Sequence, residues 1–284
     1  MMVRQVWGVI ALLAFAGCQE SSKPIQVSRV LLNGGFELDR NPKAREDIRN
    51  SIETFLQSDS SVVFGVEPKA ETHRLKVRVE AQTARQSERM DRARRVEVVL
   101  APRGGTGPTY KTFGFGGDSS ELTRSVLNGF RESWVRISQQ RRVNADDIDG
   151  LIKLAHSPEP HLMGFALDCL ASRRSAMAVP ALSKLLGEES DPDKLLRIIG
   201  ALAEIGDERA VPALIELTRR QDDYFVLQVV YAVGVIGGRI AEGFLVTLAG
   251  GHASEHVRQV ASALLKERRE PTPATNLDTN ASSS

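Results

Sequence analysis

Hydrophobic and polar positions divide the chain into two parts with different periodicities. Up to about residue 142, several short segments alternate with a period of two, and two longer ones follow the period of a helix. Strands are expected over residues 25–32, 62–66, 74–83, 95–100 and 110–115, and helices over residues 42–57 and 120–140. The order β-α-β-β-β-β-α predicts an α+β module in which helices lie against one face of a small antiparallel or mixed sheet.

The two longest patterns in this first part are the clearest. Leu75, Val77 and Val79 alternate with charged residues, which predicts a strand with one buried and one solvated face. A stripe of large apolar residues at helical spacing predicts the buried face of the second helix, for which Ser119 or Ser120 is the expected N-cap. That stripe comprises Leu122, Val126, Phe130, Trp134 and Ile137.

The second part of the chain contains internal repeats of helical period. The segment 178–182 (AVPAL) recurs as 210–214, a spacing of 32 residues. Segments 195–206, 226–237 and 256–267 align as second helices at steps of 31 and 30, and 161–172 is a divergent first copy. Four helix pairs between Asn144 and Arg269 therefore predict an all-α solenoid, because stacked pairs bury a core that one pair cannot bury.

The sequence of these repeats resembles a known family. GDERAVPALIEL (206–217) and HVRQVASALLKE (256–267) are similar to the short HEAT-like repeats of the phycobilisome-lyase type. In that pattern Gly-Asp closes one unit and Ala-Val-Pro-Ala-Leu opens the next. The resemblance implies the fold of the second part and does not by itself imply a function.

The N-terminus resembles that of a bacterial lipoprotein. Arg4 precedes the apolar run 6–16, which is too short to span a bilayer and is typical of a secretory signal. Phe15-Ala16-Gly17-Cys18 resembles a lipobox, with Phe15 where the family usually has leucine. The resemblance implies cleavage after residue 17 and lipidation of Cys18, and Gln19 in place of aspartate implies an outer-membrane lipoprotein. An ordinary signal peptide with a chance cysteine, or a plain membrane anchor, is the alternative.

The expected organisation is therefore a sequence of five segments. They are a signal peptide (1–17), a lipidated tether (18–24), a small α/β module (25–142), a HEAT-like repeat domain (144–269) and a disordered tail (270–284). The tail is rich in Pro, Thr, Ser, Asn and Ala and has little to bury.

Composition removes several classes of function. With 37 Lys and Arg against 36 Asp and Glu the chain has almost no net charge, and the arginine-rich stretch 85–95 lacks interleaved aromatic residues, so no nucleic-acid partner is expected. Cys18 and Cys169 are the two cysteines, which excludes a disulfide framework. Cys169 lies in an apolar stretch and is expected to be a buried structural residue.

The sequence offers no catalytic or metal-binding motif. His252 and His256 are four residues apart on one expected helix, without a third ligand. Cys169 has no local base, and no nucleophile elbow is found. We therefore expect neither an enzyme nor a cofactor.

Two functional hypotheses from different classes follow. The first is a non-enzymatic scaffold, held on the membrane by N-terminal acyl chains, that binds protein partners of the bacterial envelope through its repeats. The second is an enzyme or assembly factor whose solenoid cradles a small ligand or chromophore, as the resemblance to HEAT-like lyases implies. The predicted binding residues for the first are Arg197, Gln228 and Arg258, aligned in register on second helices, with Tyr224 and Tyr231 nearby. The alternative for the arginines is pairing with acidic groups of the adjoining repeat, and for the tyrosines a place in the core.

The lipobox hypothesis yields a direct prediction. Replacing Cys18 by Ala removes the thiol that would carry the lipid, so Cys18→Ala should abolish the incorporation of labelled palmitate and leave the precursor uncleaved. Metabolic labelling followed by immunoprecipitation measures both effects. Labelled palmitate in the Cys18→Ala protein would contradict the assignment.

Overall fold

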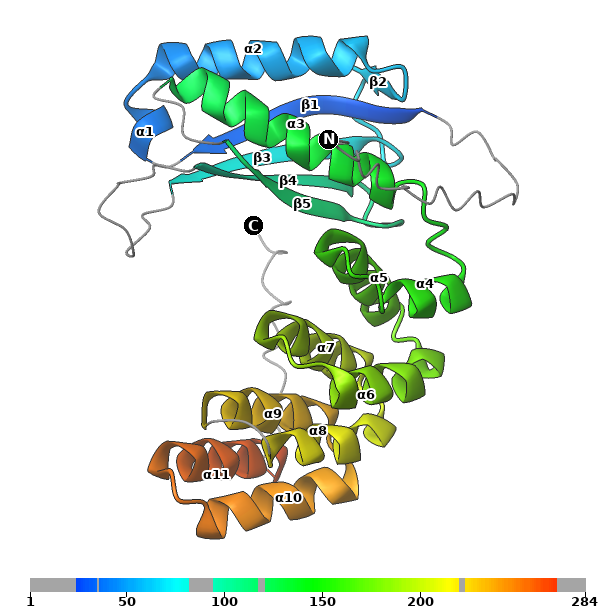
Figure 1. Cartoon of the computed structure of the whole chain (residues 1–284), viewed down its shortest axis with the longest axis vertical. Helices are drawn as coiled ribbons and strands as arrows, with labels where there is room; N and C mark the ends of the chain where they lie inside the picture. The colour runs from blue at the N-terminus through cyan, green and yellow to red at the C-terminus, as the bar shows by residue number, and fades with distance from the viewer. Residues whose placement is uncertain (1–23, 35, 82–93, 117–120, 220–222, 270–284) are drawn as a thin grey trace, which may run out of the picture.

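The chain folds into a sheet-and-helix module followed by a stack of helix pairs (Figure 1). The computed structural model describes residues 24–34, 36–81, 94–116, 121–219 and 223–269. The predicted signal peptide, Cys18, most of the tether, the Ser119 and Ser120 cap and the tail lie outside the described residues. The module comprises β1 (Ile25–Gly34), α1 (Phe36–Asp39), α2 (Pro42–Ser58), β2 (Val62–Phe64), β3 (His73–Ala81), β4 (Arg94–Pro102), β5 (Tyr110–Phe115) and α3 (Leu122–Gln140).

The sheet is mixed, in the strand order β2-β1-β3-β4-β5. β1 pairs in parallel with β2 and β3, whereas β3, β4 and β5 are antiparallel neighbours. The parallel pairing of β1 with β2 is possible because α2 forms the crossover between them. Alternation along β3 buries Leu75, Val77 and Val79 on one face, as predicted. The predicted fold class is confirmed.

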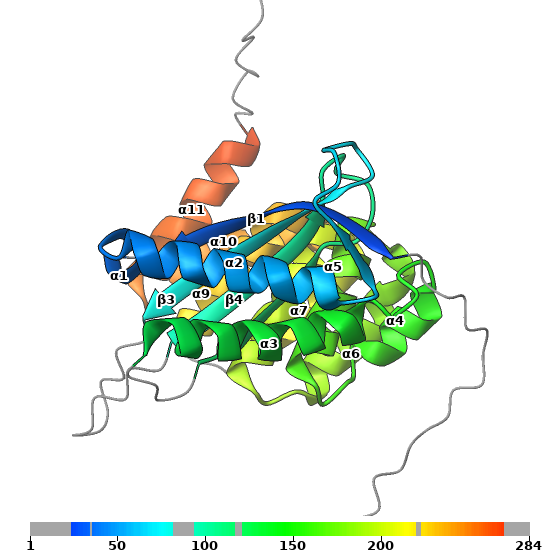
Figure 2. The ribbon, with the colours of Figure 1, turned by 90° about the horizontal axis from the view of Figure 1, so that it is seen from above.

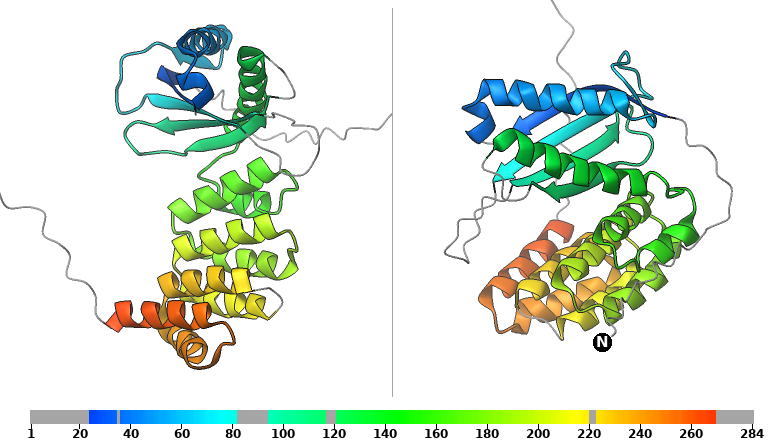
Figure 3. Two further views of the ribbon diagram at one scale, coloured as in Figure 1. Left: turned by 90° about the vertical axis from the view of Figure 1, so that its left-hand side faces the viewer. Right: turned by 45° about the horizontal axis from the view of Figure 1, so that its top comes forward.

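Helices α2 and α3 lie side by side on one face of the sheet (Figures 2 and 3). Their apolar stripes and the buried faces of β1, β3 and β4 form one core, which includes the predicted stripe residues Val126, Phe130, Trp134 and Ile137. The ring of Phe55 on α2 meets the rings of Phe130 and Trp134 edge-on.

Two predicted boundaries shift, and the structure has one additional short helix. The second strand ends at Phe64 rather than Val66, because Gly65 takes a left-handed conformation with φ +81°. α3 begins at Leu122, two residues after the predicted start at residue 120. Its N-cap residue is Glu121, whose side chain makes no capping hydrogen bond. A short helix, α1, follows β1 and was not predicted.

The outer edge of β5 is closed by three polar side chains of α3 spaced four residues apart. Glu132 Oε2 accepts a hydrogen bond from the Phe115 amide at 2.7 Å, Arg136 donates to the Phe113 carbonyl, and Gln140 Nε2 donates to the Lys111 carbonyl at 3.2 Å. Residues at this spacing share one helix face, and alternate residues of a strand point their backbone groups to one edge. The helix therefore takes the place of a sixth strand along this edge.

The second part of the chain is a two-layer solenoid of four helix pairs. The first helices are α4 (Ile148–Leu154), α6 (Val179–Glu188), α8 (Val211–Thr218) and α10 (Gly238–Gly251), and the second helices are α5 (Pro160–Ser172), α7 (Pro192–Ile205), α9 (Asp223–Ile236) and α11 (Glu255–Arg269). Short 3₁₀ turns, Ala176–Ala178 and Glu208–Ala210, precede α6 and α8. The prolines of the repeated AVPAL motif, Pro180 and Pro212, stand in the first turn of α6 and α8, where no intrahelical donor is lost.

Burial corrects the predicted alignment of the second helices. Ile198, Ile199 and Leu202 of α7 correspond to the buried Val229, Val230 and Val233 of α9 at a step of 31 residues. The next step is also 31, because Val257 and Ala261 take the buried positions of Val226 and Val230. The predicted step of 30 is therefore wrong by one residue, and Arg258 does not continue the register of Arg197 and Gln228.

Cys169 is buried in the solenoid core, as predicted. Burial raises the pKa of its thiol to about 11, so it is a structural residue at neutral pH. Among the residues that the structure describes, no helix combines the length and the apolar character needed to cross a bilayer.

Two helix glycines provide a matched test of packing. A Cβ on Gly129 of α3 would lie 2.6 Å from Cγ2 of Val96, whereas a Cβ on Gly200 of α7 would meet nothing within 4 Å. Gly129→Ala should therefore lower the free energy of unfolding by about 1–3 kcal/mol through overpacking. Gly200→Ala should raise it by about 0.5–1 kcal/mol because alanine favours the helix. Urea unfolding of both variants measures the difference, and equal effects would contradict the close approach of α3 to the sheet.

Candidate ligand and partner sites

The module and the solenoid meet where α3 ends. Gln140, the last residue of α3, donates through Nε2 both to the Lys111 carbonyl of β5 and, at 2.7 Å, to the His161 carbonyl of α5. The ring of Tyr110 on β5 stacks on Phe165 of α5, with 5.4 Å between centroids and 12° between planes. Tyr110 packs against both hydrophobic cores, so the two parts are joined by apolar contact as well as by hydrogen bonds.

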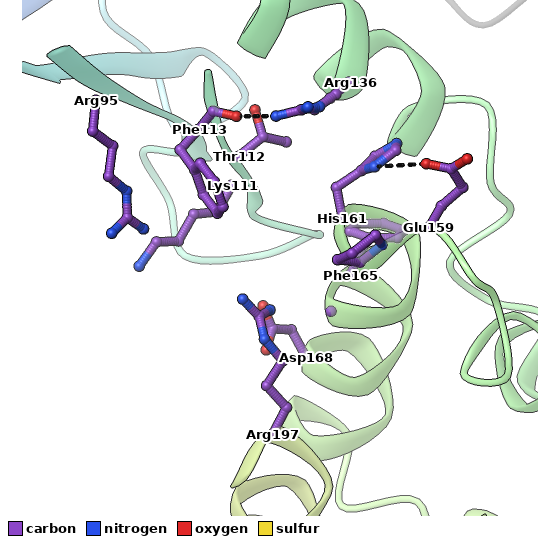
Figure 4. Close-up of a pocket in the computed structure, with 12 residues that line it drawn as sticks. Arg95, Lys111, Thr112, Phe113, Arg136, Glu159, His161, Phe165, Asp168 and Arg197 are labelled. Carbon is purple, nitrogen blue, oxygen red and sulfur yellow. Dashed lines mark hydrogen bonds and ion pairs between the residues drawn. The ribbon is translucent and has the colours of Figure 1, made fainter. Parts of the chain in front are cut away.

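A cavity of about 580 Å³ lies beside this junction (Figure 4). One wall comes from the module and the other from α5 and α7. Its lining comprises Arg95, Lys111, Thr112, Phe113, Arg136, Glu159, Pro160, His161, Gly164, Phe165, Asp168 and Arg197. In this wall Arg95, Lys111 and Phe113 alternate with residues buried under α3, such as the lining residue Thr112, and belong to the sheet face that α2 and α3 do not cover. The volume is within the range of small-molecule sites.

The four basic side chains that line the cavity have different partners. Lys111 forms an ion pair with Glu97 at 3.1 Å, and Arg136 forms one with Glu132 at 2.7 Å. The Arg95 guanidinium lies 4.3 Å above the centre of the Phe113 ring. Arg197 lies over Gly164, where a Cβ would come within 2.5 Å of its Nη1. Neither Arg95 nor Arg197 has a side-chain hydrogen bond or ion pair within the described parts of the chain.

Two titratable groups in the wall are shifted by their surroundings. Burial and the nearby charge of Arg136 lower the pKa of His161, whose Nε2 lies 2.7 Å from Oε1 of Gln139. Removal from water raises the pKa of Asp168, although the charges of Arg197 and Lys111 oppose that shift. In both groups partial burial disfavours the charged form.

The structure places four of the five predicted binding residues in three different settings. Tyr224 and Tyr231 are exposed on α9, at 57% and 49%, and so belong to the surface and not to the core. Arg197 lines the junction cavity and a second, smaller cavity of about 250 Å³ shared with Gly200 and Glu204. Gln228 is half-buried on α9.

Arg258 and the histidine pair differ from their predicted settings. Arg258 donates to the carbonyls of His252 and Ala253, so it holds the turn between α10 and α11. His252 follows the end of α10 and His256 lies in α11, so the two histidines do not share one helix as predicted. The intervening turn is fixed by the Ser254 amide, which donates to Nδ1 of His252.

Sequence reasoning missed most of the cavity. Arg95 and Lys111 lie on different strands, and Phe165, Asp168 and Arg197 come from two repeats, so no local motif contains them. The sequence does contain one relevant signal, the alternation along β4 and β5, which assigns Arg95, Lys111 and Phe113 to one sheet face. The pattern does not indicate which other part of the protein lies opposite that face.

The comparison with known families supports the repeat assignment. Residues 148–234, about a third of the chain, match the family model described as HEAT repeats. The match begins at α4 and ends within α9. No curated protein matches the chain.

The pKa of His161 gives a testable pH dependence. Because its folded-state pKa lies below the unfolded value near 6.5, the folded chain binds fewer protons, and the stabilising contribution is complete above that pH and lost as pH falls. His161→Gln should therefore lose less of its melting temperature between pH 7 and pH 5 than the native protein loses. His73, whose pKa is also lowered by burial, should account for part of the remaining decrease. An unchanged pH dependence in His161→Gln would contradict the assignment.

Proposed function

We propose that the protein is a lipid-anchored scaffold of the bacterial envelope that binds a protein partner through its HEAT-like repeats. In this proposal Cys18 carries the acyl chains, the outer membrane is the site of anchoring, and the partner is a protein and not a nucleic acid. The N-terminal resemblance to lipoproteins supports the anchor, and the repeat fold supports the scaffold. The protein performs no catalysis in this role.

The observation that carries the proposal is an aromatic patch on α9. Tyr224, Tyr231 and Val235 are exposed on this second helix, with Val235 at 68%. Tyrosine is enriched in protein interfaces because it buries a large apolar ring while its hydroxyl finds a hydrogen bond. Tyr231 takes the position of Gly200 on α7 at the step of 31. Ala166, Leu167 and Leu170 of α5 take the buried positions of Ile198, Ile199 and Leu202 at a step of 32, so Gly200 in turn takes the position of Asp168. All three positions are exposed, and the row that they form runs from the patch toward the junction cavity.

The ligand-cradling alternative is favoured by a different observation, the junction cavity itself. Its volume, its two phenylalanine side chains and its convergent polar groups are typical of a site for a small molecule. The resemblance to HEAT-like lyases suggests the same role. The two candidate functions use different surfaces, so one chain can carry both.

The aromatic patch gives a prediction about partner capture. Tyr224→Ala combined with Tyr231→Ala should lower the affinity for the partner roughly tenfold or more, because tyrosines that become buried in an interface are frequent hot spots. The melting temperature should change little, since both rings are exposed. A photo-crosslinking residue at position 231, in intact cells, identifies the partner whose affinity is then measured.

The matched control is on α10. Ile240 and Val246 are exposed at 58% and 49%, and the double variant Ile240→Ala with Val246→Ala removes a comparable apolar surface from a first helix. This double variant should bind the partner with the same affinity as the native protein. A large loss of stability without selective loss of binding in the tyrosine variant, or an equal loss in the α10 variant, would contradict the proposal.

A further inference from the structure

The junction cavity contains two arginines whose donors are unused. Each guanidinium carries several N–H groups in a planar fork that matches a carboxylate or a phosphate. Within the described residues neither Arg95 nor Arg197 forms a side-chain hydrogen bond or ion pair, and the buried Nε of Arg95 has no partner. Figure 4 shows the two guanidinium groups facing the same space from opposite walls, Arg95 from the sheet and Arg197 from the solenoid.

The other basic side chains in the wall are already neutralised. Glu97 pairs with Lys111 and Glu132 pairs with Arg136, so those charges contribute little to an added ligand. Glu159 lies at the rim, 3.8 Å from His161 and mostly in solvent. Asp168 lies close enough for the charge of Arg197 to lower its pKa against the effect of burial, but no hydrogen bond or ion pair joins these two side chains among the described residues. The side-chain N–H donors that remain available to a ligand are therefore those of Arg95 and Arg197.

The apolar part of the wall is aromatic. Phe165 is buried and held in place by its stack on Tyr110, while Phe113 is held by the Arg95 guanidinium and by the edge of Phe115. Both rings are thus positioned before any ligand enters, which reduces the ordering cost of binding. Gly164 keeps open the space into which the Arg197 side chain extends.

We propose that this cavity binds an organic anion whose carboxylate or phosphate group is held between Arg95 and Arg197 and whose apolar body rests against Phe113 and Phe165. The ligand would then connect β4 of the module to α7 of the solenoid. This inference names the ligand class for the ligand-cradling function and rests on that function, not on partner binding at α9.

The test uses three fluorinated probes that differ in their head groups. 4-Fluorobenzoate carries a carboxylate, 4-fluorophenyl phosphate carries a phosphate, and 4-fluorobenzamide is the neutral counterpart of the benzoate. Binding to the full-length protein in a non-ionic detergent is followed by the ¹⁹F line width of each probe. At least one anion should bind roughly tenfold or more tightly than the amide, and the better anion identifies the head group.

Variants connect that preference to the two arginines. Arg95→Gln and Arg197→Gln should each weaken binding of the preferred anion by roughly tenfold, the usual effect of losing a charged hydrogen-bond partner. Gly164→Ala should weaken it as well, because the added methyl group displaces the Arg197 guanidinium without removing its charge. Arg219→Gln is the control, since Arg219 directly follows α8, is exposed, pairs with Glu216 and does not line the cavity.

The outcomes separate this inference from the partner-binding proposal. Equal affinity for anions and amide, or equal anion affinity in the Arg95→Gln, Arg197→Gln and Arg219→Gln proteins, would overturn it. Crosslinking through position 231 would be unaffected by that result. Melting temperatures of the variants, measured alongside, show whether weakened binding reflects unfolding, and a folded Gly164→Ala protein keeps the test decisive if an arginine variant is unstable.

Discussion

The structure depends on the hydrogen bonds that α3 makes to the backbone groups along the free edge of β5. An edge strand presents unpaired N–H and C=O groups that would otherwise pair with another chain. Here Glu132, Arg136 and Gln140 occupy that edge from one face of α3. Because Gln140 also donates to the His161 carbonyl, the contact that closes the sheet also fixes the start of the solenoid. The position of the cavity follows from this single arrangement.

The α+β module acts as the N-terminal cap of the solenoid. A stack of repeats must cover the apolar face of its first unit, because each unit is stabilised mainly by its neighbours. In this protein Phe165 of the first pair is covered by Tyr110 of β5 and not by a further repeat. At the other end, α10 and α11 complete the stack with a smaller cluster around Val257 and Ala261.

The two proposed sites both involve second helices of the solenoid but use different chemistry. The junction cavity offers charged donors beside aromatic rings that are held in place by stacking. The α9 patch offers exposed tyrosines suited to a broad, flatter contact. Asp168, Gly200 and Tyr231 occupy equivalent positions on successive second helices, so a ligand at the junction and a partner at α9 would lie along the same row. Lipid anchoring at Cys18 would hold both sites at a membrane surface.

The sequence by itself determined the local structure and the architecture. Alternation placed the strands, helical periodicity placed α2 and α3, and the repeated Ala-Val-Pro-Ala-Leu motif identified the solenoid, because these patterns depend on short-range geometry. The register of α11 needed the structure, since Val257 and Ala261 are distinguished from their neighbours only by packing. The cavity was decided by tertiary structure alone. Arg95, Phe113 and Arg197 are brought together by the junction that Gln140 and Phe165 form, and such long-range contacts leave no periodic signal in the chain.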